Sequence, residues 1–372
     1  MIFLSIDTSS DETSAAVVEG NKILSNIIWS QASLHAKWGG IFPSLAKRLH
    51  AERIDWIIKK AVHDSRLTIN EIDAIAVTVG PGLAIALEVG IAKAKELALK
   101  WYKPLIPVNH LEGHILSPLA RSQSMIYDLS PVINFPVLGL VISGGHTELV
   151  AIEKIGQYKI LARTMDDALG EALDKAARML GLGYPGGAVL EKLAREGNPS
   201  AHKLPLPLLG RENQGHLSYS GLKTAFYRLT NEKNFNKQEI CDLAASFQNI
   251  AFEHLIRVIS RTILFRHPER SEGSRRDSSV FDLRMTKNLL VGGGVAANVE
   301  LRKRLRKLGS KSGFKVHFPY TKKLCTDNAA MIGLAGQWAF ARGEVKRTKE
   351  EIESIDRIPG LDFSFDPYLS RA

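Results

Sequence analysis

The feature that most constrains the fold is a pattern of three short strands that occurs twice along the chain. In the first copy, turns at 7–12 and 19–22 separate the strand-like runs 2–6, 13–18 and 23–29. In the second copy, turns at 143–146 and 156–157 separate the runs 137–142, 147–152 and 158–162. A helical pattern follows each copy. This repeat predicts an α/β protein with two duplicated lobes, whose strand ends line a central cleft.

The order of these patterns also sets the expected domain boundaries. We expect an N-terminal lobe formed by residues 1–110 together with about 328–350, and a C-terminal lobe formed by 111–327. A polar, Ser- and Arg-rich segment at 266–287 interrupts the second lobe and is interpreted as an exposed insertion loop. Residues 351–372 are expected to form a C-terminal tail.

Composition narrows the class of protein. The chain has 372 residues, of which 45% are hydrophobic and 24% charged, as in ordinary globular proteins. It contains no run of the roughly 18–20 apolar residues that a membrane span needs. Its two cysteines, Cys241 and Cys325, lie far apart, which favours a reducing compartment over a disulfide framework. We therefore expect a cytoplasmic protein without membrane attachment.

Positive charge is concentrated in one segment. The formal net charge is +10, and residues 300–315 contain seven basic side chains against one acidic side chain. An excess of this size favours a polyanionic partner, because Lys and Arg release counterions when they neutralise phosphates. A basic surface without any partner is the alternative interpretation.

The sequence His110-Leu-Glu-Gly-His114 indicates a metal site. Two histidines at i and i+4 lie on one face of a helix and can converge on one ion. Glu112 lies roughly 200° around the helix from His110, unlike the glutamate of zinc proteases, which directly follows the first histidine. Asp327, between a strand-like and a helical run, is the expected third ligand. Two histidines and a carboxylate suit Fe(II) or Zn(II). Taken alone, the pair is more often two surface histidines.

Turns rich in glycine follow several predicted elements. They lie at 143–147, 183–187 and 292–295. Glycine lets backbone N–H groups approach a phosphate or ribose, so three such turns favour a nucleotide site, although each alone can be an ordinary turn. Asp174 and Asn298 lie close to these turns in sequence and can hydrogen-bond a ribose or base. The polar turn 7–13 offers hydroxyls and carboxylates beside a phosphate, or is a plain hairpin turn.

Together these segments closely resemble the tRNA N6-adenosine threonylcarbamoyltransferases, a family once described as O-sialoglycoprotein endopeptidases. The resemblance runs in the family's order over nearly the whole chain. The matching stretches are 7–13, 35–50, 80–83, 110–114, 143–147, 170–187, 218–225, 292–298 and 325–332. It implies the actin/sugar-kinase/Hsp70-type (RNase H-like) fold of two duplicated lobes. It also implies transfer of the threonylcarbamoyl group from its adenylate to N6 of the adenosine 3′ of the anticodon, with release of AMP.

The resemblance assigns roles to individual residues. It implies one divalent metal ion, with Fe(II) favoured and Zn(II) possible, held by His110, His114 and Asp327. It implies a catalytic role for the acidic pair Asp11 and Glu12. The implied contacts to the adenylate come from Val141, Ile142, Ser143, Gly144, Gly145, Asp174, Gly187 and Asn298. The chain departs from the family pattern at Asp7, where Glu is more common, at Ser10, where Cys is common, and in the insertion after Phe265.

The resemblance also implies partners. They are tRNA, the threonylcarbamoyl-adenylate, a paralogous non-catalytic subunit and a small P-loop ATPase. The basic segment 300–315, with Arg302, Arg304 and Lys307, is then expected to bind the tRNA backbone. Three other classes remain open. A metallopeptidase is disfavoured by the position of Glu112, a non-catalytic scaffold is disfavoured by the histidine pair, and a kinase or ATPase of the same fold is testable by ATP turnover.

Overall fold

The chain divides into two compact units. The computed structural model describes residues 1–122, 133–211, 214–231, 235–265 and 286–363. Unit 1 comprises residues 1–132 and 318–372, and unit 2 comprises residues 133–317. The divisions fall at 132/133 and 317/318, whereas the sequence analysis placed them at 110/111 and 327/328. Unit 1 thus keeps the helix that starts at His110, because that helix packs on another helix of unit 1. Nearly all of the predicted insertion 266–287 lies outside the described residues.

The sheet of unit 1 contains six strands, β1 (Ile2–Asp7), β2 (Glu12–Glu19), β3 (Lys22–Ser30), β4 (Ala74–Gly80), β5 (Leu105–Asn109) and β6 (Arg121–Ser122). Their order is β5-β4-β1-β2-β3-β6. The first three strands are antiparallel neighbours, while β4 is parallel to β1 and β5 is parallel to β4. β6 is parallel to β3. The three strands predicted at the N-terminus therefore lie inside a mixed sheet.

Helices cover both faces of this sheet. They are α1 (Ala32–His35), α2 (Pro43–Ser65), α3 (Ala84–Trp101), α4 (His110–Leu116), α10 (Ala329–Ala341) and α11 (Lys349–Glu353). In β1, Leu4 and Ile6 belong to the apolar core shared with α2 and α3, whereas Phe3 meets Phe340 of α10 edge to face. Alternate residues of a strand point to opposite faces. Because both faces are buried, β1 carries apolar residues on both, and four of its six residues are apolar.

Unit 2 repeats the strand topology of unit 1. Its strands are β7 (Val137–Ile142), β8 (Thr147–Lys154), β9 (Gln157–Thr164), β10 (His216–Leu217), β11 (Asn288–Gly292) and β12 (Lys315–His317). The order is β10-β9-β8-β7-β11-β12, and each pairing has the same direction as its counterpart in unit 1. The duplicated α/β architecture predicted from the sequence repeat is confirmed.

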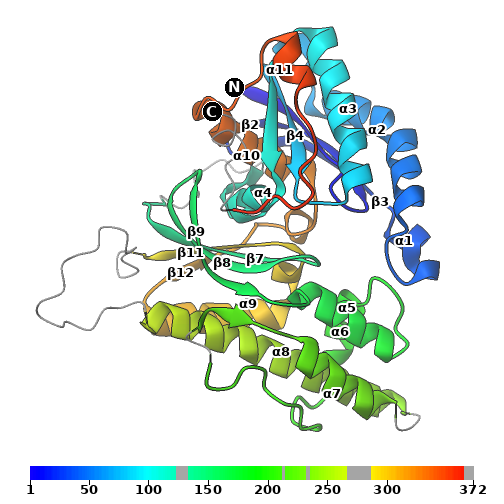
Figure 1. Ribbon diagram of the computed structural model, residues 1–372, viewed down its shortest axis with the longest axis vertical. Helices are drawn as coiled ribbons and strands as arrows, with labels where there is room; N and C mark the ends of the chain where they lie inside the picture. The colour runs from blue at the N-terminus through cyan, green and yellow to red at the C-terminus, as the bar shows by residue number, and fades with distance from the viewer. Residues whose placement is uncertain (123–132, 212–213, 232–234, 266–285, 364–372) are drawn as a thin grey trace, which may run out of the picture. The chain divides into compact units, whose positions relative to one another are not determined.

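The helices of unit 2 are α5 (Leu169–Met179), α6 (Gly187–Ala194), α7 (Ser220–Thr230), α8 (Lys237–Phe265) and α9 (Val299–Ser312). Figure 1 shows α8 and α9 on the same side of the unit 2 sheet. Asn298 caps α9 by accepting a hydrogen bond from the Leu301 N–H, and Gly313 ends the helix in the left-handed region at φ 76°. Within the described part of the chain, no helix combines the length and the apolar character that crossing a bilayer requires.

Candidate functional site

The two histidines of the metal motif lie one turn apart on α4. β5 ends at Asn109, whose side-chain oxygen accepts a hydrogen bond from the Leu111 N–H at 2.8 Å and so caps the helix. The helix therefore begins at His110, and the i, i+4 spacing puts His114 on the same face. The two ring centroids are 4.6 Å apart.

Asp327 reaches this histidine pair from the segment that precedes α10. Asn328 caps α10 by accepting a hydrogen bond from the Met331 N–H at 3.2 Å, which fixes the backbone beside Asp327. Gly113 allows α4 to approach α10 closely, since a Cβ there would lie 3.1 Å from side-chain atoms of both Met331 and Ile332. The close approach of the two helices brings together groups that are distant in sequence.

Three ligand-type atoms converge at this point. Asp327 Oδ1 lies 3.1 Å from His114 Nε2 and 3.4 Å from His110 Nε2, and the donor atoms of all three residues lie within 4.8 Å of one another. His114 is completely buried, His110 nearly so, and the Asp327 side chain is 20% exposed. The structure thus brings together the three residues that the sequence predicts as metal ligands. Two imidazoles and a carboxylate form a donor set that fits Fe(II) or Zn(II).

The electrostatics of the cluster favour a bound cation. Burial alone would lower the pKa of His110, but the carboxylates of Asp327 and Asp7 outweigh it and raise the pKa to about 10. Burial favours a high pKa for Asp327, yet the two imidazoles hold the pKa of this carboxyl well below its usual range. Burial lowers the pKa of His114 and keeps the ring in the neutral form that ligates metals. The cluster therefore stabilises positive charge. A divalent cation held by these residues would supply that charge in place of the proton on His110.

Asp7 is a further member of the cluster that the sequence analysis did not assign to it. This residue ends β1 and is fully buried, with Oδ1 3.6 Å from His110 Nδ1. Its Oδ2 has no hydrogen-bond partner among the described residues. A carboxylate behind a ligating imidazole orients the ring. An acid at the end of a buried apolar strand was the available signal, but the sequence analysis considered Asp7 only as part of the polar turn 7–13 and as a departure from the family pattern.

Asp11 and Glu12, the predicted catalytic pair, lie at the turn between β1 and β2. Burial raises the pKa of Glu12 well above its usual range, and the nearby carboxylates of Asp11 and Asp327 raise it further. A carboxylate with a raised pKa is a stronger base once it is ionised. The backbone carbonyl of Asp11 accepts a hydrogen bond from the Gln31 N–H at 2.9 Å, which fixes the turn to the start of α1.

Buried His50 of α2 braces the same turn. Its Nε2 donates to the Ser10 carbonyl at 3.0 Å, and its Nδ1 accepts from the Thr13 hydroxyl at 2.8 Å. Burial lowers the pKa of His50, which keeps the ring neutral and able to play both roles. His35 plays a parallel part, since its Nε2 donates to Gln31 Oε1 at 3.0 Å. The stretch 35–50, which the sequence analysis gave no chemical role, thus supports the acidic turn.

Glu112 is directed away from the metal cluster. Its two carboxylate oxygens accept hydrogen bonds from Arg342 of the α10 C-terminus at 3.0 and 3.3 Å. Arg342 also pairs with Glu344. The prediction that Glu112 points away from the metal-binding face of the helix is confirmed, and the residue holds α4 against the end of α10.

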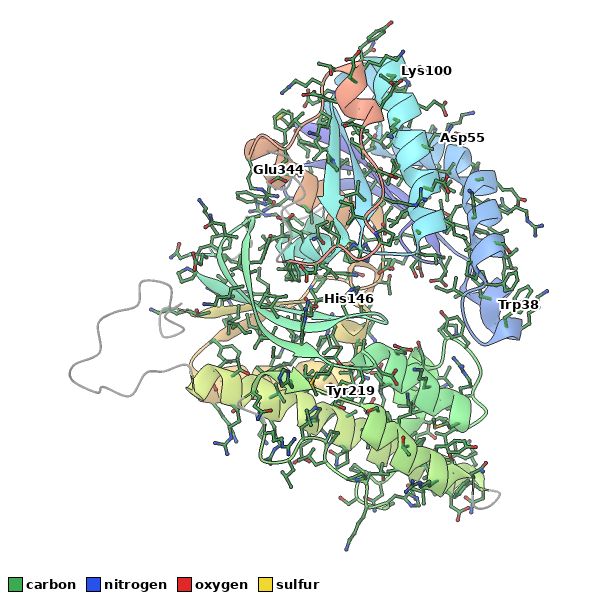
Figure 2. The ribbon with its side chains drawn as sticks, in the orientation of Figure 1. Trp38, Asp55, Lys100, His146, Tyr219 and Glu344 are labelled. Atoms are coloured by element: carbon green, nitrogen blue, oxygen red, sulfur yellow. The ribbon has the colours of Figure 1, made fainter. Side chains whose placement is uncertain are left out.

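In unit 2, glycine turns converge on the end of β7. The turn between β7 and β8 is closed by a hydrogen bond of 2.8 Å from the Ser143 N–H to the carbonyl of His146, which Figure 2 labels. A Cβ at Gly170, in the first turn of α5, would overlap the Ser143 carbonyl. A Cβ at Gly293 would overlap the Ile142 carbonyl, and the φ of 94° at Gly293 also favours glycine. Two predicted nucleotide segments, 143–147 and 292–295, are therefore adjacent.

The predicted adenylate contacts differ in what they offer to a ligand. Gly144 and Gly145 are exposed, and a Cβ built on either meets no atom within 4 Å. Val141 and Ile142 are fully buried in β7 and expose no surface to a ligand. Exposed N–H groups of the turn thus remain the best candidates for contacting a phosphate.

Asp174 and Asn298 already have structural partners. Asp174 Oδ1 accepts hydrogen bonds from the N–H groups of Gly186 and Gly187 at 2.9 and 2.7 Å, which seats the third glycine turn on α5. Besides capping α9, Asn298 donates from Nδ2 to Gln248 Oε1 at 2.9 Å. Ligand contact by either residue remains a prediction.

Comparison with known proteins identifies the family of the chain. A family model described as tRNA N6-adenosine threonylcarbamoyltransferase matches residues 22–334. Proteins of that name from Syntrophotalea carbinolica and Clostridium kluyveri are both 43% identical to the chain. The first covers 92% of this chain and 93% of its own length, and the second covers 96% of each. The protein of that name from Bartonella henselae is also 43% identical, with 92% of each chain covered.

Solved structures support the two-lobed fold. The Clostridium difficile activator of 2-hydroxyisocaproyl-CoA dehydratase has a TM-score of 0.50 and 13% identity, covering 96% of this chain and 99% of that one. HypF of T. kodakarensis has a TM-score of 0.52 and 15% identity, covering 94% of this chain and 49% of that one. The expected actin/sugar-kinase/Hsp70-type fold is confirmed. By the family model and these relatives, the chain belongs to the tRNA N6-adenosine threonylcarbamoyltransferases, enzymes that form threonylcarbamoyladenosine in tRNA.

Proposed function

We propose that the chain carries out its transfer with one divalent metal ion held by His110, His114 and Asp327. The threonylcarbamoyl group moves from L-threonylcarbamoyl-adenylate to N6 of the adenosine 3′ of the anticodon, and AMP is released. The convergence of the three donor atoms within 4.8 Å in a buried site is the observation that carries this proposal. Fe(II) is favoured by the family resemblance, with Zn(II) as the alternative, because two histidines and a carboxylate suit either ion.

The metal ion has a defined chemical purpose in this reaction. The exocyclic amine of adenosine is a poor nucleophile, and a divalent ion bound at this site would supply Lewis-acid polarisation of the carbonyl under attack. Asp7 behind His110 Nδ1 orients the ring so that Nε2 faces the ligand position. Asp11 or Glu12 accepts the proton that the amine loses, and the raised pKa of Glu12 suits that role.

Unit 2 is proposed to bind the adenylate. Exposed N–H groups at Gly144 and Gly145 contact the phosphate of AMP, and such preorganised donors stabilise the negative charge of the leaving group. Gly187 ends the neighbouring glycine turn. Asp174 Oδ1 of α5 holds the backbone of this turn in place. Asn298 contacts the nucleoside through donor capacity left after its contact with Gln248.

The cellular setting of the enzyme is also a proposal. The family resemblance supports a complex with a paralogous non-catalytic subunit and a small P-loop ATPase. Cys241 and Cys325 are both free and buried, which supports the reducing environment of the cytoplasm. A metallopeptidase activity is disfavoured because Glu112, the only acid within the histidine motif, is engaged by Arg342.

Transfer of label from the adenylate to a tRNA transcript tests the proposal. Replacing His110 with Ala removes a ligand, so bound metal falls below one equivalent and kcat falls about a thousandfold, as expected when several kcal/mol of transition-state stabilisation are lost. Asp327→Asn should have the same effect. His63→Ala, at an exposed histidine of α2, is the matched control and should keep both metal and kcat. Full activity of His110→Ala without metal would refute the assignment.

A further inference from the structure

A basic groove runs between α8 and α9 of unit 2. It has a volume of about 970 Å3. Six cationic side chains line it, against the two carboxylates Glu253 and Glu300. The six are Arg257, Arg261, Lys303, Arg304, Lys307 and Lys311. The metal cluster belongs to the other unit, so this groove is a separate feature of the molecule.

Two arginines of α9 are engaged in holding the fold. Arg304 pairs with Glu300 at 2.8 Å, donates to the carbonyl and side chain of Asn249 at 3.0 and 2.7 Å, and lies over the Phe252 ring. Arg302, outside the groove, donates from Nε to the Ala296 carbonyl at 2.6 Å. The sequence analysis expects both residues to contact tRNA. Their hydrogen bonds in the structure anchor α9 to its surroundings.

The lysines of the groove are different. Lys303, Lys307 and Lys311 are exposed, and within the described residues none of them makes a hydrogen bond or ion pair. Their spacing of four residues puts them on one face of α9, with a rise of about 6 Å from each to the next. Arg257 and Arg261 of α8 line the same groove with the same spacing. The groove therefore presents two rows of positive charge along its length.

The composition of the groove indicates which partner fits it. Protein interfaces have an apolar or aromatic centre depleted in lysine, whereas Ile256 and Leu308 are the only apolar side chains lining this groove. A nucleic-acid backbone carries regularly spaced charges and is bound largely by Lys and Arg without base recognition. We propose that the groove between α8 and α9 binds the phosphodiester backbone of the tRNA substrate. This inference rests on the proposed function, since it supplies the substrate's second point of contact.

Neutralising the three lysines together tests the proposal. Binding of a tRNA transcript to full-length Lys303→Gln/Lys307→Gln/Lys311→Gln protein is measured over a series of KCl concentrations. The slope of log K against log salt should become shallower by about three, because each lysine that no longer neutralises a phosphate reduces the slope by about one. In the transfer assay, the KM for tRNA should rise about tenfold or more, while kcat and the KM for the adenylate stay unchanged.

A control variant carries the same change in charge elsewhere. Lys100→Gln/Lys154→Gln/Lys192→Gln removes three exposed lysines on α3, β8 and α6, and Figure 2 labels the first of them. It should keep the wild-type slope, because none of these side chains lines the groove. An equal loss in the control, or a wild-type slope in the groove variant, overturns the proposal. The proposal is also overturned if the groove variant binds tRNA normally but loses binding to a protein subunit.

These measurements separate the groove from the chemistry of the metal centre. His110→Ala should bind tRNA with the wild-type slope and lose only transfer. If wild-type protein binds tRNA through the groove but His110→Ala still transfers the group, the proposed metal centre fails and the groove stands. If His110→Ala loses transfer while the groove variant binds tRNA normally, the groove fails and the metal centre stands.

Discussion

In unit 1 the turn after the first strand is bordered by the acids Asp7, Asp11 and Glu12, whereas the corresponding turn of unit 2 exposes Gly144 and Gly145. The two turns occupy the same place in the same strand topology. One therefore concentrates negative charge and the other offers backbone N–H groups. Duplication supplied two equivalent positions, and the side chains at each determine whether a metal ion or a phosphate suits it.

The two turns are also held in place by different means. The turn of unit 2 is closed by hydrogen bonds between Ser143 and His146, and the backbone of α5 supports it through the Gly170 N–H, which donates to the Ser143 carbonyl at 3.2 Å. The turn of unit 1 is supported by a side chain, because His50 of α2 binds the Ser10 carbonyl and the Thr13 hydroxyl. Burial and the neighbouring carboxylates raise the pKa of Glu12, so bringing these acids together is unfavourable. The acidic turn should therefore be the more sensitive of the two to substitutions outside it.

Replacing His50 with Ala tests that difference and should have the largest effect of the three changes considered next. It leaves the buried Thr13 hydroxyl without its partner and frees the Ser10 carbonyl, so Asp11 and Glu12 lose their alignment. We expect kcat to fall about 10–100-fold, the usual effect of misplacing a reacting group by about 1 Å. The KM for the adenylate should not change, and bound metal should stay near one equivalent, because the ligands His110, His114 and Asp327 lie outside this turn.

Two further variants separate positioning by His50 from a general loss of stability. His50→Gln keeps a side-chain N–H donor and should recover part of kcat. His254→Ala removes a fully buried histidine of unit 2 that accepts the Ser218 N–H at 3.2 Å, so it should lower the melting temperature without a matching loss of kcat. Equal effects of His50→Ala and His254→Ala on kcat would show that the acidic turn has no special dependence on its brace.

Gly144→Ala tests the corresponding turn of unit 2 and should have a smaller effect. A Cβ at this position meets no protein atom within 4 Å, so the fold and the bound metal should be preserved. The added methyl group obstructs a ligand that approaches the backbone, and the KM for the adenylate should rise about tenfold, or about 1.4 kcal/mol. Gly360→Ala, at another open glycine, is the control. An unchanged KM would remove the turn from the adenylate site.

The repeat could be predicted because strand alternation and turns are local signals. The duplicated α/β fold and the histidine pair followed from the same kind of signal, since i, i+4 spacing is a direct consequence of helix geometry. The domain boundaries differed, because the packing of α4 on α10 depends on Gly113, a close contact that no local pattern reveals. The same holds for Asp7 and His50, whose importance comes from partners far away in sequence.

Charge counts were a weaker guide than the spacing of the histidines. Seven basic residues in 300–315 indicated a polyanion site, but the sequence could not separate Arg304, bound to Asn249 and Glu300, from the exposed lysines beside it. Likewise, Asp174 and Asn298 were chosen for polarity near glycine turns, and the structure shows that both also organise the backbone. Short polar side chains serve caps and ligands equally well, so composition alone does not distinguish the two uses.

The smallest effect is expected from a partly buried ion cluster of unit 2. Asp167 accepts a hydrogen bond from Lys175 of α5 at 2.7 Å and also pairs with Lys223 of α7, so it joins the two helices. Burial favours a high pKa for Asp167, but the two ammonium groups outweigh it and lower the pKa. In unit 1, Asp55 makes a comparable contact with Lys93 at 2.9 Å, but its side chain is 66% exposed. The two aspartates therefore differ in burial and in the number of lysines that they contact.

Asp167→Asn should lower the free energy of unfolding by about 1 kcal/mol at pH 7, because a partly buried pair exceeds the value of an exposed one. A carboxyl whose pKa is lowered by folding stabilises the protein above its unfolded pKa of about 3.9 and ceases to do so as pH falls through the folded value. The difference in free energy of unfolding between wild type and Asp167→Asn, measured by urea unfolding, should thus persist at neutral pH and shrink below about pH 4.

Asp55→Asn is the comparison variant, at the residue labelled in Figure 2, and should show a smaller difference in free energy of unfolding at neutral pH. Equal differences for the two variants would mean that burial adds nothing to the ion pairs of unit 2.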